Sequence, residues 1–124
     1  MKRISLFVGV LALMAIFIFV ITSEKDGIMK IDVKTIQNKL GNEEITLLDV
    51  REASEYEGGH IEGAVNAPLS SLDANQLSYP KDEPIYVICR SGNRSARAAS
   101  QLQDAGYTEI YDVSGGMMAW ESIE

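Results

Sequence analysis

The sequence predicts an α/β domain with a mainly parallel central sheet and helices on both faces, preceded by one N-terminal hydrophobic helix. Two observations predict this class. From residue 28 onward, short apolar runs alternate with stretches of helical periodicity, which is typical of strand–helix–strand units with parallel pairing. A separate uncharged run lies near the N-terminus. We therefore divide the chain into an N-terminal transmembrane anchor or signal segment at residues 1–23, a linker at 24–28 and one domain at 29–124.

The N-terminal segment has the composition of a membrane anchor. Lys2 and Arg3 precede an uncharged run at residues 4–21. A helix over this run would be about 27 Å long, close to the roughly 30 Å hydrocarbon core of a bilayer. A cleaved signal peptide usually has a shorter apolar region that ends in a small-residue site. Residues 20–23 match such a site poorly, and no cysteine near them could carry a lipid. We therefore favour a retained single-pass anchor, and the alternative is a secreted or periplasmic protein after signal cleavage.

Charge and composition exclude several classes of function. Both leading charges precede the apolar run, so the positive-inside rule places the domain outside the cytoplasm. The formal net charge of −7 argues against binding of nucleic acid or anionic lipid through bulk charge. One cysteine and one histidine are too few for the ligands of a zinc site, and we expect neither a metal nor another cofactor. A single cysteine cannot form an internal disulfide, so its thiol is free.

The first strand and helix follow the linker. Residues 28–31 have the pattern of a brief edge strand. Asp32 can cap a helix over residues 33–40, whose apolar side chains share one face, and Gly41 would end it. We interpret this part of the chain as scaffold.

A second strand is predicted at residues 45–50, a mostly apolar run of the kind found in strands that are covered on both faces. Asp49 and Arg51 close this strand at its carboxyl end, where open α/β sheets place their ligand sites. We interpret the two residues as an ion pair that supports the loop. Residues 52–57 are expected to form one helical turn before a pair of glycines breaks it.

The residues in the middle of the domain are interpreted as structural. His60 is the only histidine and lies in a glycine-flanked turn, so we interpret it as structural and not as a catalytic base. Residues 69–77 suggest a short helix, and residues 78–84 an exposed turn region that contains two prolines. No internal repeat or low-complexity segment is evident.

The central motif follows the third predicted strand, residues 85–88, which ends at Cys89. A polar loop comes next, and then a helix over residues 94–105. This order aims backbone N–H groups of the loop and of the helix N-terminus at the sulfur. Such donors, with the positive charges of Arg90 and Arg94, favour a thiolate and lower the pKa of a cysteine from its usual value near about 8.5.

The last elements complete the sheet. Gly106 fits the C-terminal cap of the preceding helix, and residues 109–113 have the pattern of a final strand. A turn at residues 114–116 leads into a helix that carries Met117, Met118 and Trp120. We interpret these three side chains as core.

Four segments resemble the single-domain rhodanese family of sulfurtransferases over roughly residues 29–124. They are Asp49-Val50-Arg51 with Glu55-Tyr56, then Gly59-His60-Ile61-Glu62-Gly63-Ala64-Val65-Asn66-Ala67-Pro68, then Cys89-Arg90-Ser91-Gly92-Asn93-Arg94-Ser95, and Gly115-Gly116-Met117-Met118-Ala119-Trp120. The resemblance implies a rhodanese-like fold. It also implies a catalytic Cys89 that takes a sulfane sulfur from a donor such as thiosulfate, as a persulfide, and passes it to cyanide or a thiol.

Each residue of the cysteine loop then has an expected role. The residues expected to bind the substrate or the persulfide are Arg90, Ser91, Gly92, Asn93, Arg94 and Ser95, with Asp49 and Arg51 as support. We expect Arg90 to attract an anionic donor and Arg94 to brace the loop. Ser95 could hydrogen-bond the sulfur or cap the helix, and we favour the cap.

Two other functions stay open. Cysteine-based phosphatases and arsenate reductases of the same fold have a Cys-x5-Arg loop, whereas here only four residues separate Cys89 from Arg94. The shorter loop should fit one sulfur atom better than a tetrahedral oxyanion. The third candidate is a non-catalytic tethered module that binds a partner or carries persulfide. The expected partners are therefore a small sulfur donor, a thiol or cyanide acceptor, and the membrane through residues 4–21.

Overall fold

The structure, a computed structural model, describes residues 27–124. The expected anchor and most of the expected linker lie outside the described residues. Among residues 27–124, no helix is both long enough and apolar enough to cross a membrane.

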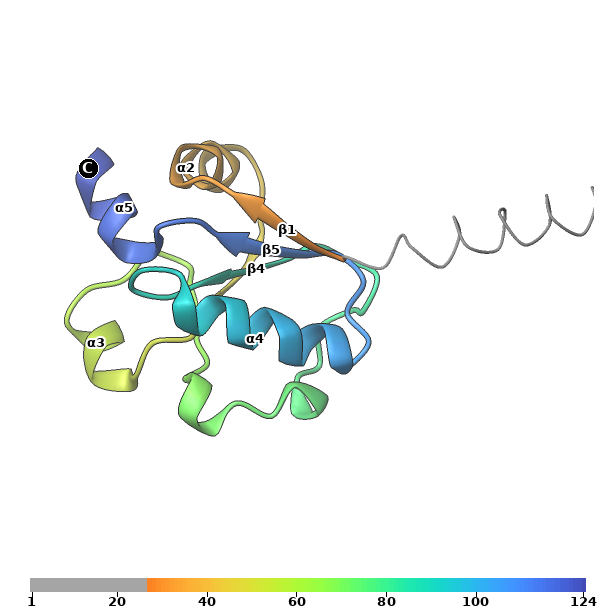
Figure 1. Cartoon of the computed structure of the whole chain (residues 1–124). Helices are drawn as coiled ribbons and strands as arrows, with labels where there is room; N and C mark the ends of the chain where they lie inside the picture. The colour runs from red at the N-terminus through yellow and green to blue at the C-terminus, as the bar shows by residue number, and fades with distance from the viewer. Residues whose placement is uncertain (1–26) are drawn as a thin grey trace, which may run out of the picture.

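A five-stranded sheet forms the centre of the domain (Figure 1). Its strands are β1 (Ile28–Ile31), β2 (Thr46–Asp49), β3 (Val65–Asn66), β4 (Ile85–Ile88) and β5 (Ile110–Val113). The order across the sheet is β1-β5-β4-β2-β3, and each described pair of neighbours is parallel. The predicted parallel sheet is confirmed, and so is the edge position of β1.

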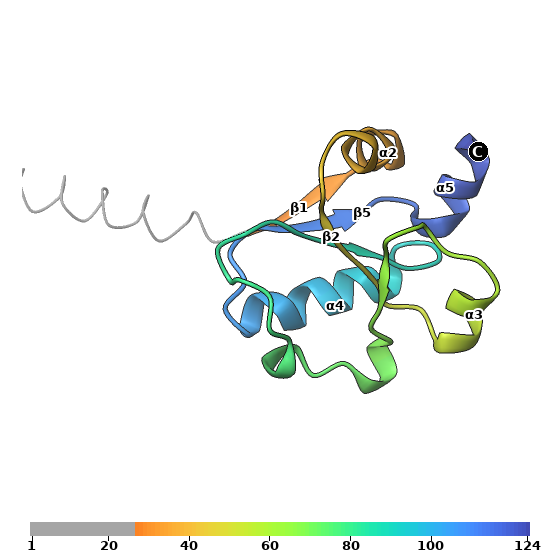
Figure 2. The ribbon, with the colours of Figure 1, turned by 180° about the vertical axis from the view of Figure 1, so that it is seen from behind.

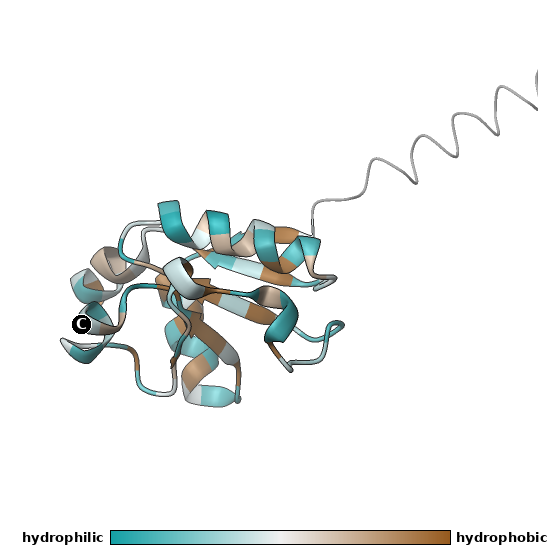
Figure 3. Ribbon diagram, turned by 90° about the horizontal axis from the view of Figure 1, so that it is seen from below, coloured by the Kyte–Doolittle hydropathy of each residue, from teal (hydrophilic) through white to brown (hydrophobic). Residues whose placement is uncertain are grey.

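Helices cover both faces of this sheet (Figures 1 and 2). They are α2 (Val33–Asn42), α3 (Ala53–Glu57), α4 (Asn93–Asp104) and α5 (Gly116–Ile123). Because successive strand residues point to opposite faces, Leu48 and Val87 pack with α4, whereas Leu47 and Ile88 pack with α2 and α5. Figure 3 shows the hydrophobic residues gathered along the strands and along the helices beside them. Two buried clusters, one on each face, therefore hold the sheet in place.

The start of α2 is confirmed and its predicted end is wrong. Asp32 caps the helix, since its Oδ1 accepts a hydrogen bond from the Thr35 N–H at 2.8 Å. Gly41 does not stop the helix, which continues to Asn42 and ends where the Glu43 N–H bonds the Lys39 carbonyl at 2.9 Å. Glycine is favoured at the end of a helix mainly because it can take a left-handed conformation, and Gly41 does not take one.

The short helix expected over residues 69–77 is instead two separate 3-10 turns, η1 (Leu69–Ser71) and η2 (Ala74–Gln76). Between them the backbone of Leu72 and Asp73 is extended. The Leu69 N–H bonds the Val50 carbonyl at 3.0 Å, which ties the first turn to the end of β2. The Asp73 carboxylate starts the second turn by accepting a hydrogen bond from the Asn75 N–H.

The parallel arrangement separates the two ends of the sheet. The carboxyl ends of β2, β4 and β5 lead into Val50, Cys89 and Ser114, so these three segments meet at one edge. Gly27 lies just before β1, at the opposite end. Any segment that precedes Gly27 therefore joins the domain at the end away from Cys89.

Candidate active site

Cys89 lies directly after β4, at the base of a tight loop. Its side chain is 1% exposed, and the Gly92 N–H donates a hydrogen bond to its sulfur at an N···Sγ distance of 3.0 Å. Gly92 is the N-cap of α4 and has a φ of +118°. A side chain would strain this conformation, so glycine allows the loop to curl back over the sulfur. The loop that the sequence predicted around Cys89 is therefore present.

Ser95 contacts the sulfur directly. Its Oγ lies 3.4 Å from Cys89 Sγ and donates a hydrogen bond to the Gly92 carbonyl at 3.1 Å. The favoured interpretation of Ser95 as the helix cap is wrong, because Gly92 holds that position and Ser95 is the third residue of the helix. In the thiol form the S–H donates to Ser95 Oγ. After ionisation the hydroxyl can turn and donate to the sulfur.

These contacts favour ionisation of the sulfur. Burial raises the pKa of the Cys89 thiol, but hydrogen bonds to the sulfur outweigh that effect. They come from the Ser95 hydroxyl and from the backbone N–H groups of Ser95, Gly92 and Ser91. The net pKa of Cys89 lies below that of an ordinary thiol. Hydrogen bonds, more than nearby arginine charge, therefore favour the thiolate.

The two arginines of the loop have different surroundings. Arg94 donates to the Glu55 carboxylate through Nη1 at 2.7 Å and Nη2 at 2.9 Å, so its charge is matched. Arg90 is exposed, and its guanidinium has no hydrogen-bond or ion-pair partner within residues 27–124. Arg94 therefore braces the loop against α3, as expected, and Arg90 is free to meet an anion.

The expected ion pair at the end of β2 is present and fully buried. Arg51 donates to the Asp49 carboxylate through Nε at 3.0 Å and Nη2 at 2.8 Å. The same Nη2 donates to the Gly59 carbonyl at 2.7 Å. The side chains of Asp49 and Arg51 are 0% and 8% exposed. The pair thus fixes the glycine turn after α3 to the edge of the sheet that carries Cys89.

Helix α5 holds the cysteine loop from the other side. The Met117 and Met118 N–H groups donate to the carbonyls of Cys89 and Arg90 at 2.8 and 3.0 Å. Gly116 has a φ of +56°, and a Cβ there would lie 2.6 Å from the Arg90 oxygen and closer still to the Cys89 oxygen. Only glycine therefore lets the N-terminus of α5 approach the loop this closely. Sequence reasoning treated this segment as core and missed the contact.

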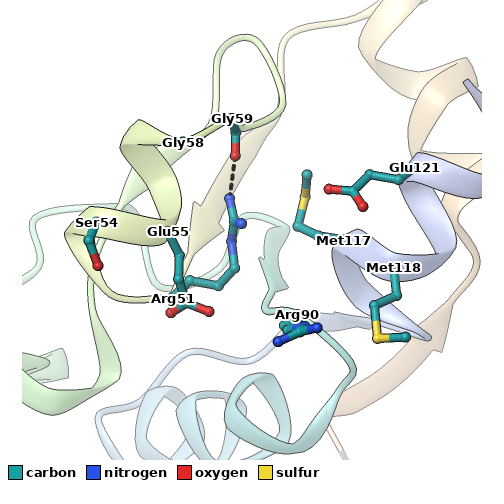
Figure 4. A pocket seen from close by; sticks show the side chains of 9 residues that line it. All are labelled: Arg51, Ser54, Glu55, Gly58, Gly59, Arg90, Met117, Met118 and Glu121. Atoms are coloured by element: carbon teal, nitrogen blue, oxygen red, sulfur yellow. Dashed lines mark hydrogen bonds between the residues drawn. The ribbon is translucent and has the colours of Figure 1, made fainter.

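A pocket of about 330 Å³ opens between α3, α5 and the cysteine loop (Figure 4). Its lining residues are Arg51, Ser54, Glu55, Gly58, Gly59, Arg90, Met117, Met118 and Glu121. Met117 and Trp120 are buried, as expected, but Met118 is 56% exposed and lines the pocket. The roles of Met118 and Glu121 had no signal in the sequence, because only the placement of α5 brings them to the site.

His60 lies outside this pocket. Its ring stacks on Tyr56 with the ring centroids 3.6 Å apart, and its Nδ1 lies 2.8 Å from the Tyr56 carbonyl oxygen. These contacts agree with the interpretation of His60 as a structural residue. Residues 27–124 bring together no group of three His, Cys, Asp or Glu side chains that could hold a metal ion.

Comparisons with known proteins agree with this geometry. The family model described as a rhodanese-like domain matches residues 32–123. The uncharacterized protein YqhL of Bacillus subtilis is 45% identical over 82 residues, which are 66% of this chain and 65% of YqhL. The thiosulfate sulfurtransferase GlpE of Pseudoalteromonas translucida is 31% identical over 83 residues, which cover 67% of this chain and 79% of GlpE.

A solved structure is also similar. The crystal structure of a rhodanese-like domain protein from Staphylococcus aureus has a TM-score of 0.68 and 32% sequence identity. The match covers 74% of this chain and 90% of that one. The chain spans about half to two thirds of the length of the first curated relatives that it matches.

Proposed function

Because the chain belongs to the rhodanese-like domain family, among whose members are named sulfurtransferases, we propose that it transfers a sulfane sulfur through a persulfide on Cys89. The Cys89 thiolate attacks the outer sulfur of a thiosulfate-type donor. A bond forms between the two sulfurs, the donor's S–S bond breaks, and its electron pair leaves with sulfite. Cyanide or a thiol then attacks the outer persulfide sulfur, and Cys89 leaves as the thiolate.

The observation that carries this proposal is the set of donors around one sulfur. The Gly92 N–H and the Ser95 hydroxyl lie 3.0 and 3.4 Å from Sγ. The Gly92 N–H is fixed by the backbone and stabilises negative charge without reorganising, and the Ser95 hydroxyl can turn to donate once the sulfur is ionised. They serve the thiolate before transfer and the persulfide anion afterwards.

The pocket supports an anionic donor. Arg90 lines it and is not engaged in another ion pair among the described residues. Arg51 also lines it, but its charge is matched by Asp49. Arg90 is therefore the residue that we assign to attraction of the donor, and thiosulfate is the donor that we propose on the strength of the GlpE relative.

Sulfur transfer is favoured over phosphate or arsenate chemistry. Only four residues separate Cys89 from Arg94, a loop that should fit one sulfur atom better than a tetrahedral oxyanion, and the Arg94 guanidinium is paired with Glu55. The binding-module alternative is less favoured, because the donor set around Cys89 is complete and stabilises a reactive thiolate.

The test is steady-state formation of thiocyanate from thiosulfate and cyanide, with hydrolysis of an aryl phosphate measured in parallel. We expect thiocyanate formation by the wild-type chain and none by Cys89→Ser. Circular dichroism would check that the variant is folded. Equal thiocyanate formation by the two proteins, or turnover of the aryl phosphate alone, would contradict the proposal.

We also propose that residues 4–21 anchor the protein in a membrane with the domain on the extracytoplasmic side, as the charge pattern of the sequence favours. Gly27 lies at the end of the sheet away from Cys89, so an anchor that precedes it would be joined to the domain at the end opposite the cysteine loop. Fractionation of cells that express the chain should place it with the membranes. Recovery as a soluble protein whose mass lacks the N-terminal segment would favour signal cleavage.

A further inference from the structure

The pocket presents two charges that have no partner among the described residues. Arg51, Glu55, Arg90 and Glu121 are its charged lining residues. Arg51 is paired with Asp49, and Glu55 is paired with Arg94. Within residues 27–124, neither the Arg90 guanidinium nor the Glu121 carboxylate takes part in a hydrogen bond or an ion pair. The pocket thus offers one free cation and one free anion to a ligand.

The two free charges are separated by an apolar wall. Figure 4 shows Arg90 and Glu121 at different margins of the pocket, with Met117 and Met118 between them. Helix α5 brings Met117, Met118 and Glu121 to one side, because residues three and four apart share a helix face. The arrangement fits a ligand with opposite charges at its two ends and a short apolar body.

Resting on the proposed sulfur transfer, we propose that the acceptor is a small zwitterionic thiol of the amino-acid class. Its carboxylate would bind Arg90, its ammonium group would bind Glu121, and its methylene group would contact the methionines. The volume of about 330 Å³ lies at the lower end of the usual range for small-molecule sites.

The transfer itself balances without an added oxidant or reductant. The acceptor's thiolate attacks the outer sulfur of the Cys89 persulfide, and a new S–S bond forms in the acceptor. The bond between that sulfur and Cys89 Sγ breaks, and its electron pair stays on Sγ. The products are the acceptor persulfide and the Cys89 thiolate.

The experiment uses the purified 124-residue chain, loaded with sulfur by thiosulfate. Release of one equivalent of sulfite reports the first half of the reaction and does not depend on any acceptor. Discharge of the persulfide is then followed with cysteine, with N-acetylcysteine, which lacks the ammonium charge, and with cysteamine, which lacks the carboxylate. The three thiols are compared at equal thiolate concentration. Cysteine should have the lowest half-saturating concentration of the three thiols. Each of the other two, which lacks one charge, should need a concentration about two- to fivefold higher.

Substitutions of Glu121 distinguish binding of the acceptor's ammonium group from a structural role of this residue. Glu121→Gln should raise the half-saturating concentration of cysteine to that of N-acetylcysteine. The half-saturating concentration of N-acetylcysteine and the maximal rate of persulfide discharge should stay unchanged. Glu121→Lys should reverse the preference. Glu57→Gln, which removes an exposed acid that does not line the pocket, is the matched control and should change nothing.

Two results would overturn the inference while the sulfur transfer stands. In the first, sulfite is released, but cysteine and N-acetylcysteine have the same half-saturating concentration with the wild-type chain. In the other, Glu121→Gln weakens both thiols equally. Absence of the sulfite burst would instead overturn the sulfur transfer, and the acceptor assignment with it.

Discussion

Arg94 and Glu55, which are 39 positions apart in the chain, form a bidentate ion pair that joins the start of α4 to α3. Hydrogen bonding to Arg94 is the largest cause that lowers the pKa of Glu55, to about 2 from an ordinary 4.5. The Glu55 Oε2 also accepts a hydrogen bond from the Glu52 N–H at 2.9 Å. One carboxylate therefore holds both the cysteine loop and the turn that borders the pocket.

Glu55→Gln should lower the free energy of unfolding by about 1 kcal/mol near neutral pH, because the ion pair is partly exposed. A carboxyl whose pKa is lowered by folding stabilises above its ordinary pKa. The difference between wild type and variant should therefore shrink as the pH falls from about 5 to about 2. Urea unfolding at several pH values measures this difference in the free energy of unfolding. Glu57→Gln is the control, and a difference that grows toward low pH would contradict the assignment.

Gly116→Ala should lower the free energy of unfolding by more than about 1 kcal/mol and reduce sulfur transfer, because the new Cβ would collide with the Cys89 and Arg90 carbonyls. Gly41→Ala is the matched control. Gly41 lies inside α2, and a Cβ there would meet nothing within 4 Å. That substitution should leave stability unchanged or raise it by up to about 1 kcal/mol. Chemical denaturation measures the free energy of unfolding of both variants. Equal changes in the two variants would contradict a close contact between α5 and the cysteine loop.

Arg51→Met should destabilise the domain by about 3–5 kcal/mol, because it leaves the Asp49 carboxylate buried without its partner. The double variant Asp49→Asn, Arg51→Met removes the orphaned charge and should recover part of that loss. Denaturant midpoints of the two variants measure the effect. A loss below about 1 kcal/mol in the single variant would show that the pair is dispensable.

Ser95→Ala should raise the pKa of Cys89, because the hydroxyl is the largest of the hydrogen bonds that lower it. The pH dependence of sulfite release from thiosulfate should shift to higher pH, whereas the backbone donors should still allow transfer at alkaline pH. Ser100→Ala, an exposed position on the same helix, is the control. Identical pH profiles for Ser95→Ala and wild type would contradict the role of the hydroxyl.

The features that sequence reasoning predicted correctly have local causes. The apolar runs of β2 and β4 are buried on both faces of the sheet, and Asp32 caps α2 because its carboxylate needs only a neighbouring N–H. The cysteine loop was predictable for the same reason, since a strand, a glycine and a helix follow one another without interruption.

The features that it missed depend on contacts between distant segments. Glu55 could not be assigned to Arg94, nor Gly116 to the Cys89 carbonyl, because periodicity and capping rules carry no information about such pairs. Ser95 was misassigned because Gly92 already caps α4, which leaves the hydroxyl for the sulfur. The lining of the pocket by Met118 and Glu121 follows from the docking of α5 onto the loop.

Hydrogen-bond donors of the loop let the Cys89 sulfur ionise more readily than an ordinary thiol does. Because the chain contains one cysteine, its thiolate ultraviolet absorbance reports Cys89 alone, once the tyrosine titration seen in Cys89→Ser is subtracted. Titration of the folded chain should give a midpoint below that of the same chain unfolded in urea. A folded-state midpoint equal to or above the unfolded one would contradict the account.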